Sequence, residues 1–107
     1  MTGRNALLLA LVALIPMSAQ ATPPAPRTLV VSIAKMKFGA IPAGLRRGDA
    51  ILWINRDIFR HTATATGLFD VDLEPGAQAK SVLTASGKFT VKCKYHPGMS
   101  ASLAIAG

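Results

Sequence analysis

Turn-forming residues recur at short intervals along most of this 107-residue chain and leave little room for long helices. Glycine reaches positive φ, and proline fixes φ and lacks an amide donor, so both interrupt regular structure. The turn signals are Pro42-Ala43-Gly44, Gly48-Asp49, Thr66-Gly67, Pro75-Gly76, Ser86-Gly87 and Pro97-Gly98. Between them, no window long enough for a helix shows a 3.6-residue hydrophobic period free of Gly or Pro. The pattern therefore favours an all-β fold of short strands.

The segments between these turns are rich in β-branched residues and predict strands. The predicted strands are 28–33, 50–54, 81–84, 89–91 and 103–105, with the Thr-rich segment 61–66 as a further candidate. Within 50–54 both faces are apolar, so we expect one face in the core and the other covered by a loop or exposed as a contact patch. Strands of this length and spacing are typical of a β-sandwich or barrel.

The first 21 residues have the layout of a secretory signal peptide. Arg4 supplies a positive charge, residues 6–15 form an uninterrupted apolar run, and Ala19-Gln20-Ala21 matches an A-x-A cleavage site. An uncleaved membrane anchor is the alternative, but the apolar run is shorter than the roughly 20 residues that span a bilayer. We therefore expect a periplasmic protein with no stable membrane association after the signal peptide (1–21) is removed.

The remaining chain begins with a Pro-rich lead-in over 22–27, and we expect the folded domain over 28–107. The chain contains one cysteine, Cys93, so no disulfide can form within it. A small domain without disulfides needs good sheet packing or a metal to be stable. A free thiol in an oxidising compartment is prone to oxidation unless it is occupied, which makes Cys93 a candidate ligand.

Side chains with soft or borderline donor atoms recur every three residues in Cys93-x-x-His96-x-x-Met99, and His61 is the other histidine of the chain. Taken singly, a buried Cys or Met is more often a core residue. Together, two imidazoles, a thiolate and a thioether form the donor set of a blue-copper site. Zinc is the rival metal, but a thioether is a poor zinc ligand. Pro97-Gly98 is a turn between the last two donors, so the loop can close around one ion.

Two segments resemble the ligand motifs of the cupredoxin family of blue copper proteins. Residues 55–62 (NRDIFRHT) resemble the N-x-D-x-x-x-H-T segment that carries the first histidine ligand. Residues 91–100 (VKCKYHPGMS) resemble the C-x-x-H-P-x-M loop, with the short spacing of amicyanin-type members. Phe69, Pro75-Gly76 and the segment 86–89 (SGKF) are similar to further family features, so the resemblance covers about residues 28–106.

The resemblance implies a Greek-key β-sandwich with one type 1 copper ion at one end, cycling between Cu(I) and Cu(II). It implies that the ligands are His61, Cys93, His96 and Met99. It also implies that the protein shuttles single electrons between redox proteins in the periplasm. The edge of His96 would reach the surface within an apolar patch where transient partners dock.

Three positions depart from the family pattern. Thr62 stands where other members carry an asparagine that braces the ligand loops, and its hydroxyl could make an equivalent hydrogen bond. Lys94 and Tyr95 lie between the Cys and His of the loop. We expect the Lys94 ammonium to favour the reduced site and raise its potential.

The formal net charge of the chain is +7, and its basic residues are spread along the sequence. They include Arg46-Arg47, Arg56, Arg60, Lys92 and Lys94, and several of these lie near the predicted ligands in sequence. They form either an ordinary solvated surface or a field that steers the protein to an acidic redox partner. We expect the protein to be a monomer. We do not expect it to bind nucleic acid, because the chain has few aromatic residues and no nucleic-acid motif.

Two functions share this ligand set: electron transfer, and copper binding or delivery without an electron-transfer role. An enzymatic role is not expected. A copper oxidase or nitrite reductase needs further histidines for a second copper site, and both histidines here are already used.

Overall fold

The computed structural model describes residue 3, residues 10–15, residue 22 and residues 24–107. Most of the predicted signal peptide, including its cleavage site, lies outside the described residues. The described residues contain no helix, and hence none that is long and apolar enough to cross a membrane.

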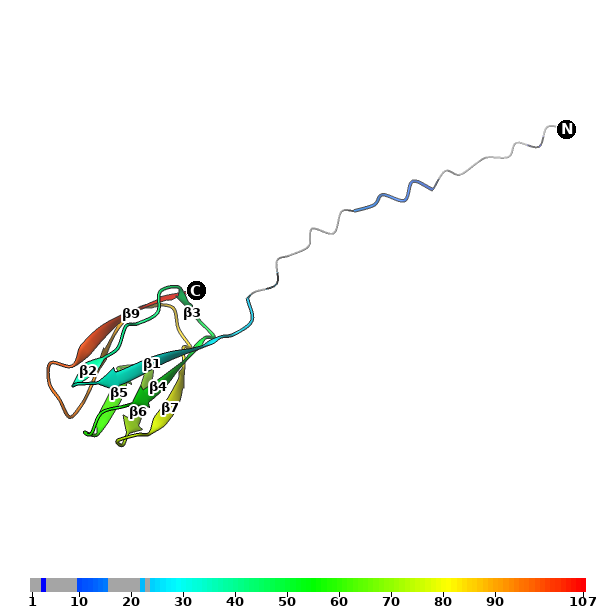
Figure 1. Ribbon diagram of the computed structural model, residues 1–107. Coiled ribbons are helices and arrows are strands. Elements are labelled where there is room, and N and C mark those ends of the chain that lie inside the picture. The colour runs from blue at the N-terminus through cyan, green and yellow to red at the C-terminus, as the bar shows by residue number, and fades with distance from the viewer. Residues whose placement is uncertain (1–2, 4–9, 16–21, 23) are drawn as a thin grey trace.

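Nine strands follow one another along the chain (Figure 1). They are β1 (Thr28–Ala34), β2 (Lys37–Phe38), β3 (Leu45–Arg46), β4 (Ala50–Asn55), β5 (His61–Ala65), β6 (Phe69–Leu73), β7 (Gln78–Val82), β8 (Gly87–Lys92) and β9 (Ser100–Ala106). One sheet has the order β2-β1-β4-β7 and the other the order β3-β9-β8-β5-β6. The chain passes repeatedly from one sheet to the other, as in Greek-key sandwiches. The prediction of an all-β sandwich is confirmed.

The core lies between the two sheets and is built from alternate residues of the strands. In β4, Ile51 and Trp53 are fully buried, whereas Leu52 and Ile54 on the opposite face are partly exposed. The Trp53 ring lies with its centroid 5.8 Å from that of Phe38, and its indole nitrogen donates a hydrogen bond to the Ser81 hydroxyl at 3.1 Å. Burying each large side chain of this kind stabilises the fold by about 1.5–3 kcal/mol.

The strand predictions differ from the structure in two ways: one predicted strand has different bounds, and three strands were not predicted. The predicted strand 81–84 is instead β7, which begins and ends earlier, although Leu83 beyond its end is fully buried. The strands β2, β3 and β6 were not predicted from the sequence. In β6, Phe69, Val71 and Leu73 alternate with two aspartates, and a stretch of five residues with such polar positions gives a weak strand signal.

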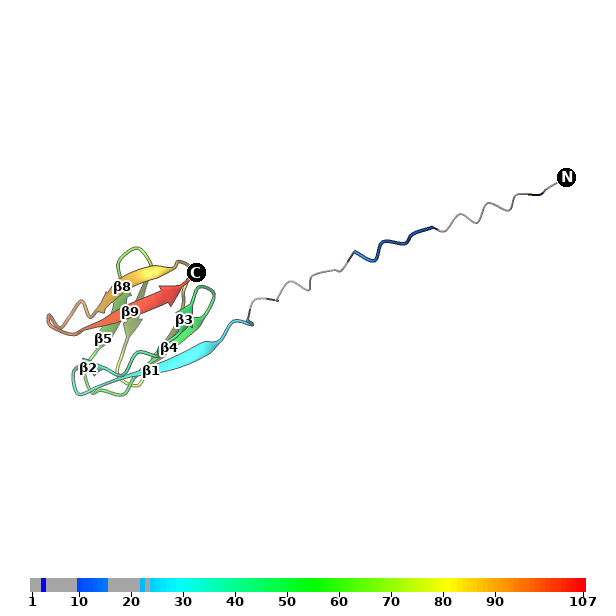
Figure 2. The ribbon, with the colours of Figure 1, turned by 90° about the horizontal axis from the view of Figure 1, so that it is seen from above.

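Antiparallel pairing brings the two predicted ligand segments to the same end of the sandwich. β8 is antiparallel to both β5 and β9, so the end of β8 lies beside the beginnings of the other two strands. His61 is the first residue of β5, and the loop 93–99 joins β8 to β9. This loop, orange in Figures 1 and 2, lies at the end of the sandwich opposite the C-terminus.

Candidate metal centre

The loop between β4 and β5 is shaped by the buried side chain of Asn55. Its amide nitrogen donates to the carbonyl oxygens of Phe59 at 2.8 Å and Leu73 at 2.9 Å. Its carbonyl oxygen accepts a hydrogen bond from the Asp57 amide at 2.9 Å. Asn55 is fully buried, so these bonds satisfy its polar atoms and fix the loop that leads into His61.

The loop between β8 and β9 is closed by two backbone hydrogen bonds. The Cys93 amide donates to the Met99 carbonyl at 3.2 Å, which joins the ends of the loop. The Met99 amide donates to the His96 carbonyl at 3.1 Å, which closes a tight turn with Pro97 and Gly98 at its centre. Gly98 has a φ of 98°, a value that a type II turn requires at this position and that glycine adopts without strain.

These two loops bring three of the four predicted ligands together. One side-chain donor atom each from His61, Cys93 and His96 lies within 4.8 Å of the other two. His61 is fully buried, Cys93 is 5% exposed, and His96 is partly exposed. The two imidazole rings meet edge to face with centroids 4.8 Å apart. This spacing of a thiolate and two imidazoles suits a single metal ion.

The orientation of His61 is set by Asp57. The Nε2 atom of His61 lies 2.8 Å from a carboxylate oxygen of Asp57. The hydrogen bond from His61, followed by the amide of Met36, lowers the pKa of Asp57, so its carboxylate is ionised and accepts hydrogen bonds only. Nε2 therefore carries the proton, and the lone pair of Nδ1 points to Cys93, whose sulfur lies 3.7 Å away.

His96 is oriented in a comparable way by a backbone group. Its Nε2 atom lies 3.1 Å from the carbonyl oxygen of Arg60, which can only accept a hydrogen bond. Nδ1 of His96 therefore keeps its lone pair for a metal. The Phe59 ring meets the His96 ring edge to face with centroids 6.1 Å apart. Both histidines thus present the same ring nitrogen, the one closer to the backbone.

The Cys93 sulfur receives a hydrogen bond from the Thr62 amide at 3.4 Å, which helps to fix the position of the sulfur. The Thr62 hydroxyl oxygen accepts a hydrogen bond from the Lys94 amide at 2.9 Å and so joins β5 to the ligand loop. The expectation that this threonine braces the two loops is confirmed. Because Thr62 is fully buried, the brace is shielded from water.

Met99 lies in the same loop, is 6% exposed, and belongs to the hydrophobic core cluster together with Cys93. Its backbone bonds to both Cys93 and His96 hold it close to them. That His61, Cys93, His96 and Met99 are together the ligands of a metal stays a prediction. The surroundings fit such an ion, since the donors are oriented by neighbouring groups and two of the three are buried.

Charged pairs tie the ligand loop to β6, and this changes the expected effect of Lys94. Its ammonium lies 2.7 Å from a carboxylate oxygen of Asp70. The hydrogen bond from Lys94 lowers the pKa of Asp70, and the same bond raises the pKa of Lys94. The positive charge expected to raise the potential is therefore offset by a neighbouring negative charge.

A second group of contacts links Tyr95 and Arg60 through Asp72. The Tyr95 hydroxyl donates to a carboxylate oxygen of Asp72 at 2.8 Å. The Arg60 guanidinium makes two hydrogen bonds to the same carboxylate, each 2.8 Å long, and its Cζ lies 5.2 Å from the centre of the Tyr95 ring. The Arg60 guanidinium, followed by Tyr95, lowers the pKa of Asp72. The bridging aspartates Asp70 and Asp72 were not identified from the sequence, because the strand signal of β6 is weak.

The fold and the buried cluster together define the class of protein. A two-sheet β-sandwich with His, Cys and His at one end is the architecture of a cupredoxin, and the resemblance seen in the sequence is confirmed. No protein-family model matches the chain, and no curated protein sequence does so either.

Similar solved structures include several amicyanins. The reduced state of one amicyanin mutant is 25% identical with a TM-score of 0.64, over 73% of this chain and 81% of that chain. The oxidized state of another mutant is 26% identical with a TM-score of 0.61, over the same shares. The reduced Cu(I) form of a third mutant at pH 4 is 24% identical with a TM-score of 0.63, over 81% of this chain and 87% of that chain.

Proposed function

We propose that this protein is a periplasmic type 1 copper protein that carries single electrons between redox partners. The proposed ligands of the one copper ion are His61, Cys93, His96 and Met99. The observation that carries the proposal is the convergence of a buried thiol and two imidazoles, each oriented by its own hydrogen bond. That the similar structures are of amicyanin, one of them in its Cu(I) form, supports copper as the metal.

Bound copper would supply one-electron chemistry between Cu(I) and Cu(II). The thiolate and thioether suit Cu(I), and imidazole suits both oxidation states. The residues of this chain hold the donors in place: Asp57 fixes His61, Thr62 joins the two loops, and the Arg60 carbonyl fixes His96. A donor set held in this way need not rearrange when an electron arrives or leaves, which favours electron transfer over release of the metal.

The surface around His96 is suited to brief contacts with partners. Ile58 is 81% exposed, and Phe59, which contacts the His96 ring, is 49% exposed. Tyr95 on the ligand loop is 45% exposed. A small apolar patch of this kind supports transient docking of a protein that is otherwise monomeric.

A periplasmic copper-binding or delivery protein without an electron-transfer role is the alternative function. An enzymatic role is not proposed, because both histidines of the chain already belong to the one cluster. The two remaining functions differ in a measurable way. A carrier of electrons exchanges them quickly and reversibly, whereas a delivery protein transfers copper to a copper-free partner.

A visible absorption spectrum of the Cu(II)-loaded protein tests the proposal. We expect an intense thiolate-to-copper charge-transfer band and its loss in Cys93→Ser. Reversible cyclic voltammetry, with no copper lost to a copper-free acceptor protein, would support electron transfer over delivery. A colourless Cu(II) complex would show that the centre is not a blue-copper site.

The axial position gives a separate prediction. We expect Met99→Leu to keep copper and colour but to raise the reduction potential, because a weak axial thioether tunes the metal more than it holds it. The potential is measured by voltammetry on both proteins. Loss of copper from this variant would mean that Met99 contributes substantially to metal binding.

A further inference from the structure

The side-chain carboxylates of this chain are all paired with basic residues, and among the described residues none of them pairs with a lysine of β8. The sequence holds five acidic residues. Their partners in the structure are Arg27 for Asp49, His61 for Asp57, Lys94 for Asp70, and Arg60 for both Asp72 and Glu74. Lys88 and Lys92 are exposed and have no carboxylate within ion-pair distance among the described residues. The positive charge of β8 is therefore available to an outside partner.

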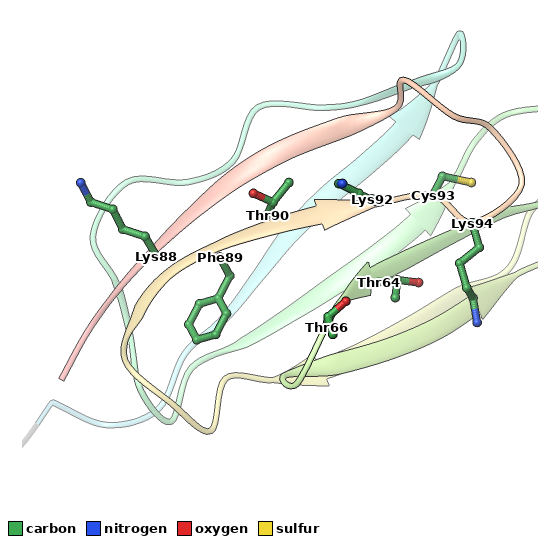
Figure 3. A pocket seen from close by; sticks show the side chains of 8 residues that line it. All are labelled: Thr64, Thr66, Lys88, Phe89, Thr90, Lys92, Cys93 and Lys94. Carbon is green, nitrogen blue, oxygen red and sulfur yellow. The ribbon is translucent and has the colours of Figure 1, made fainter.

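These lysines lie on one hollowed face of the molecule. Alternation along β8 places Lys88, Thr90 and Lys92 on the outer face of the sheet, while Val91 enters the core. A pocket of about 550 Å³ is lined by both lysines, by Thr64, Thr66, Phe89 and Thr90, and at its far end by Cys93 and Lys94. Figure 3 shows these side chains spread along β8 and the neighbouring end of β5.

The pairing of β8 explains why the face is hollow. β8 pairs with β9 along its whole length, from Gly87 to Lys92, but with β5 only where Thr64 lies opposite Lys92. Beyond this point β5 ends and the chain turns into β6, so the first residues of β8 have no strand beside them on that side among the described residues. Short hydroxyl side chains line the space that remains.

We propose that this β8 face, defined by Lys88, Thr90, Lys92 and Thr64, is a docking site for an acidic surface of the redox partner. The inference rests on the proposed function and names the chemistry of the partner. Lys88 and Lys92 are four residues apart in one strand, a separation of about 13 Å that suits carboxylates spread over a protein surface. Lys92 is the last residue of β8 and directly precedes Cys93, so a partner bound here contacts the strand that leads into the Cys93 thiol.

This site is distinct from the apolar patch around His96. Charged contacts of the β8 face speed association and weaken with salt, whereas apolar contacts do not depend on salt in this way. Lys94, at the end of the pocket nearest the ligand loop, is neutralised by Asp70. Among the described residues that line this pocket, Lys88 and Lys92 therefore keep their positive charge without a carboxylate partner, whereas Lys94 on the ligand loop is paired.

The test uses ¹⁵N-labelled, Cu(I)-loaded protein and a twelve-residue polyglutamate peptide at low ionic strength. We expect peptide-induced amide shifts along β8 and at Thr64, at least a ten-fold loss of affinity in Lys88→Glu/Lys92→Glu, and loss of the shifts at high salt. The control is Lys80→Glu/Arg47→Glu, which makes the same change of net charge at exposed positions elsewhere, and we expect it to retain affinity within about two-fold. A dispersed spectrum shows that each variant is folded.

Shifts confined to Phe59 and His96, or an equal loss of affinity in the control, would overturn the proposal. Binding to phosphatidylglycerol vesicles that depends on Lys88 and Lys92, without any binding of the peptide, would also overturn it and assign the face to a lipid surface. The experiment needs no electron transfer. An irreversible redox couple would therefore count against the proposed electron-transfer function. The amide shifts caused by the peptide would still show whether the β8 face binds acidic groups.

Discussion

The carboxylate of Asp57 determines which nitrogen of His61 faces the other donor atoms. It lies 2.8 Å from Nε2 and is itself held by the Met36 amide at 3.0 Å. Groups that orient a metal-binding histidine in this way commonly change metal affinity by about ten- to a hundred-fold when they are removed. Asp57 is part of the N-x-D segment of the sequence, but only the structure shows what its side chain does.

We expect Asp57→Ala to weaken copper binding by about ten- to a hundred-fold, because His61 loses the acceptor that fixes its proton on Nε2. Competition titration with a copper chelator measures the affinity. Asp57→Asn keeps an oxygen acceptor at the same place, so its loss of copper affinity should be much smaller. Equal affinities of the alanine variant and the original protein would show that His61 is oriented by packing alone.

The pairing of Lys94 with Asp70 predicts two opposite changes of the reduction potential. Asp70→Asn removes a negative charge and leaves Lys94 unpaired, so the potential should rise. Lys94→Gln removes the positive charge, so the potential should fall, and the double variant should return close to the original value. Voltammetry on the original protein, the two single variants and the double variant measures the four potentials. Single changes that shift the potential in the same direction would rule out a simple charge effect.

At the scale of elements, the site depends on two loops that meet at one end of the sandwich. The β4–β5 loop leads directly into His61 at the start of β5, and the β8–β9 loop supplies Cys93 and His96. The β1–β2 turn supports them, since the Met36 amide donates to Asp57. In this turn Lys35 and Met36 have φ of 52° and 61°, a conformation that non-glycine residues rarely adopt. The sequence Lys-Met carries no turn signal, which is why this hairpin was missed.

The opposite end of the sandwich is tied together by Asp49. Its carboxylate, 4% exposed, accepts hydrogen bonds from the Arg27 guanidinium at 2.7 Å and from the Arg46 amide at 3.0 Å. The hydrogen bond from Arg27 is the main cause that lowers the pKa of Asp49 to about 2, against the opposing effect of burial. The entry to β1, the strand β3 and the start of β4 are joined through this one side chain.

This pairing predicts how stability depends on pH. Because the pKa is lower in the folded protein, ionised Asp49 stabilises the fold above its unfolded pKa, and the contribution is lost as the pH falls from about 4 to about 2. We expect the original protein to be more stable than Asp49→Asn near pH 6 and the difference to shrink between pH 4 and pH 2. Urea denaturation of both proteins across this pH range measures the difference in their free energies of unfolding. A difference that does not vary with pH would contradict the assignment.

At the scale of the whole molecule, metal binding and core packing contribute to the same folding equilibrium. The domain has no disulfide, and its one cysteine is buried in the cluster. An ion that binds only the folded protein stabilises it by about 4 kcal/mol when present at a thousand times its dissociation constant. This is similar to the roughly 3–5 kcal/mol lost when a buried tryptophan is reduced to alanine.

We therefore expect Trp53→Ala to be largely unfolded without copper and folded with it, since Trp53 is fully buried between the sheets. Thermal unfolding followed by circular dichroism, with and without Cu(I), measures both states. Trp53→Phe fills most of the space and should stay folded in either state. If copper leaves the melting temperature of these proteins unchanged, the ion does not contribute to folding.

The fold class could be predicted from the sequence alone, and the sequence also identified the candidate donor residues, three of which the structure brings together. Turn signals fix where strands can lie, and Cys93, His96 and Met99 are close in sequence, so their spacing alone restricts their geometry. The strands β2, β3 and β6 could not be predicted from the sequence. Two of them have only two residues, and in β6 the apolar residues alternate with aspartates. For such short elements, pairing with neighbours outweighs local preference.

How the donor side chains are oriented, and which charged side chains are paired, could be learned from the three-dimensional structure and not from the sequence. His61 reaches Cys93 because antiparallel pairing places the start of β5 beside the end of β8. Asp70 neutralises Lys94 through a contact between β6 and the ligand loop, and no carboxylate of the described residues pairs with Lys88. Asp57 and His61 are only four residues apart, and the path of the β4–β5 loop brings their side chains together. Hydrogen bonds and ion pairs act over about 3–4 Å, and the order in which β8, β5 and β6 pair within one sheet decides which residues far apart in sequence come that close.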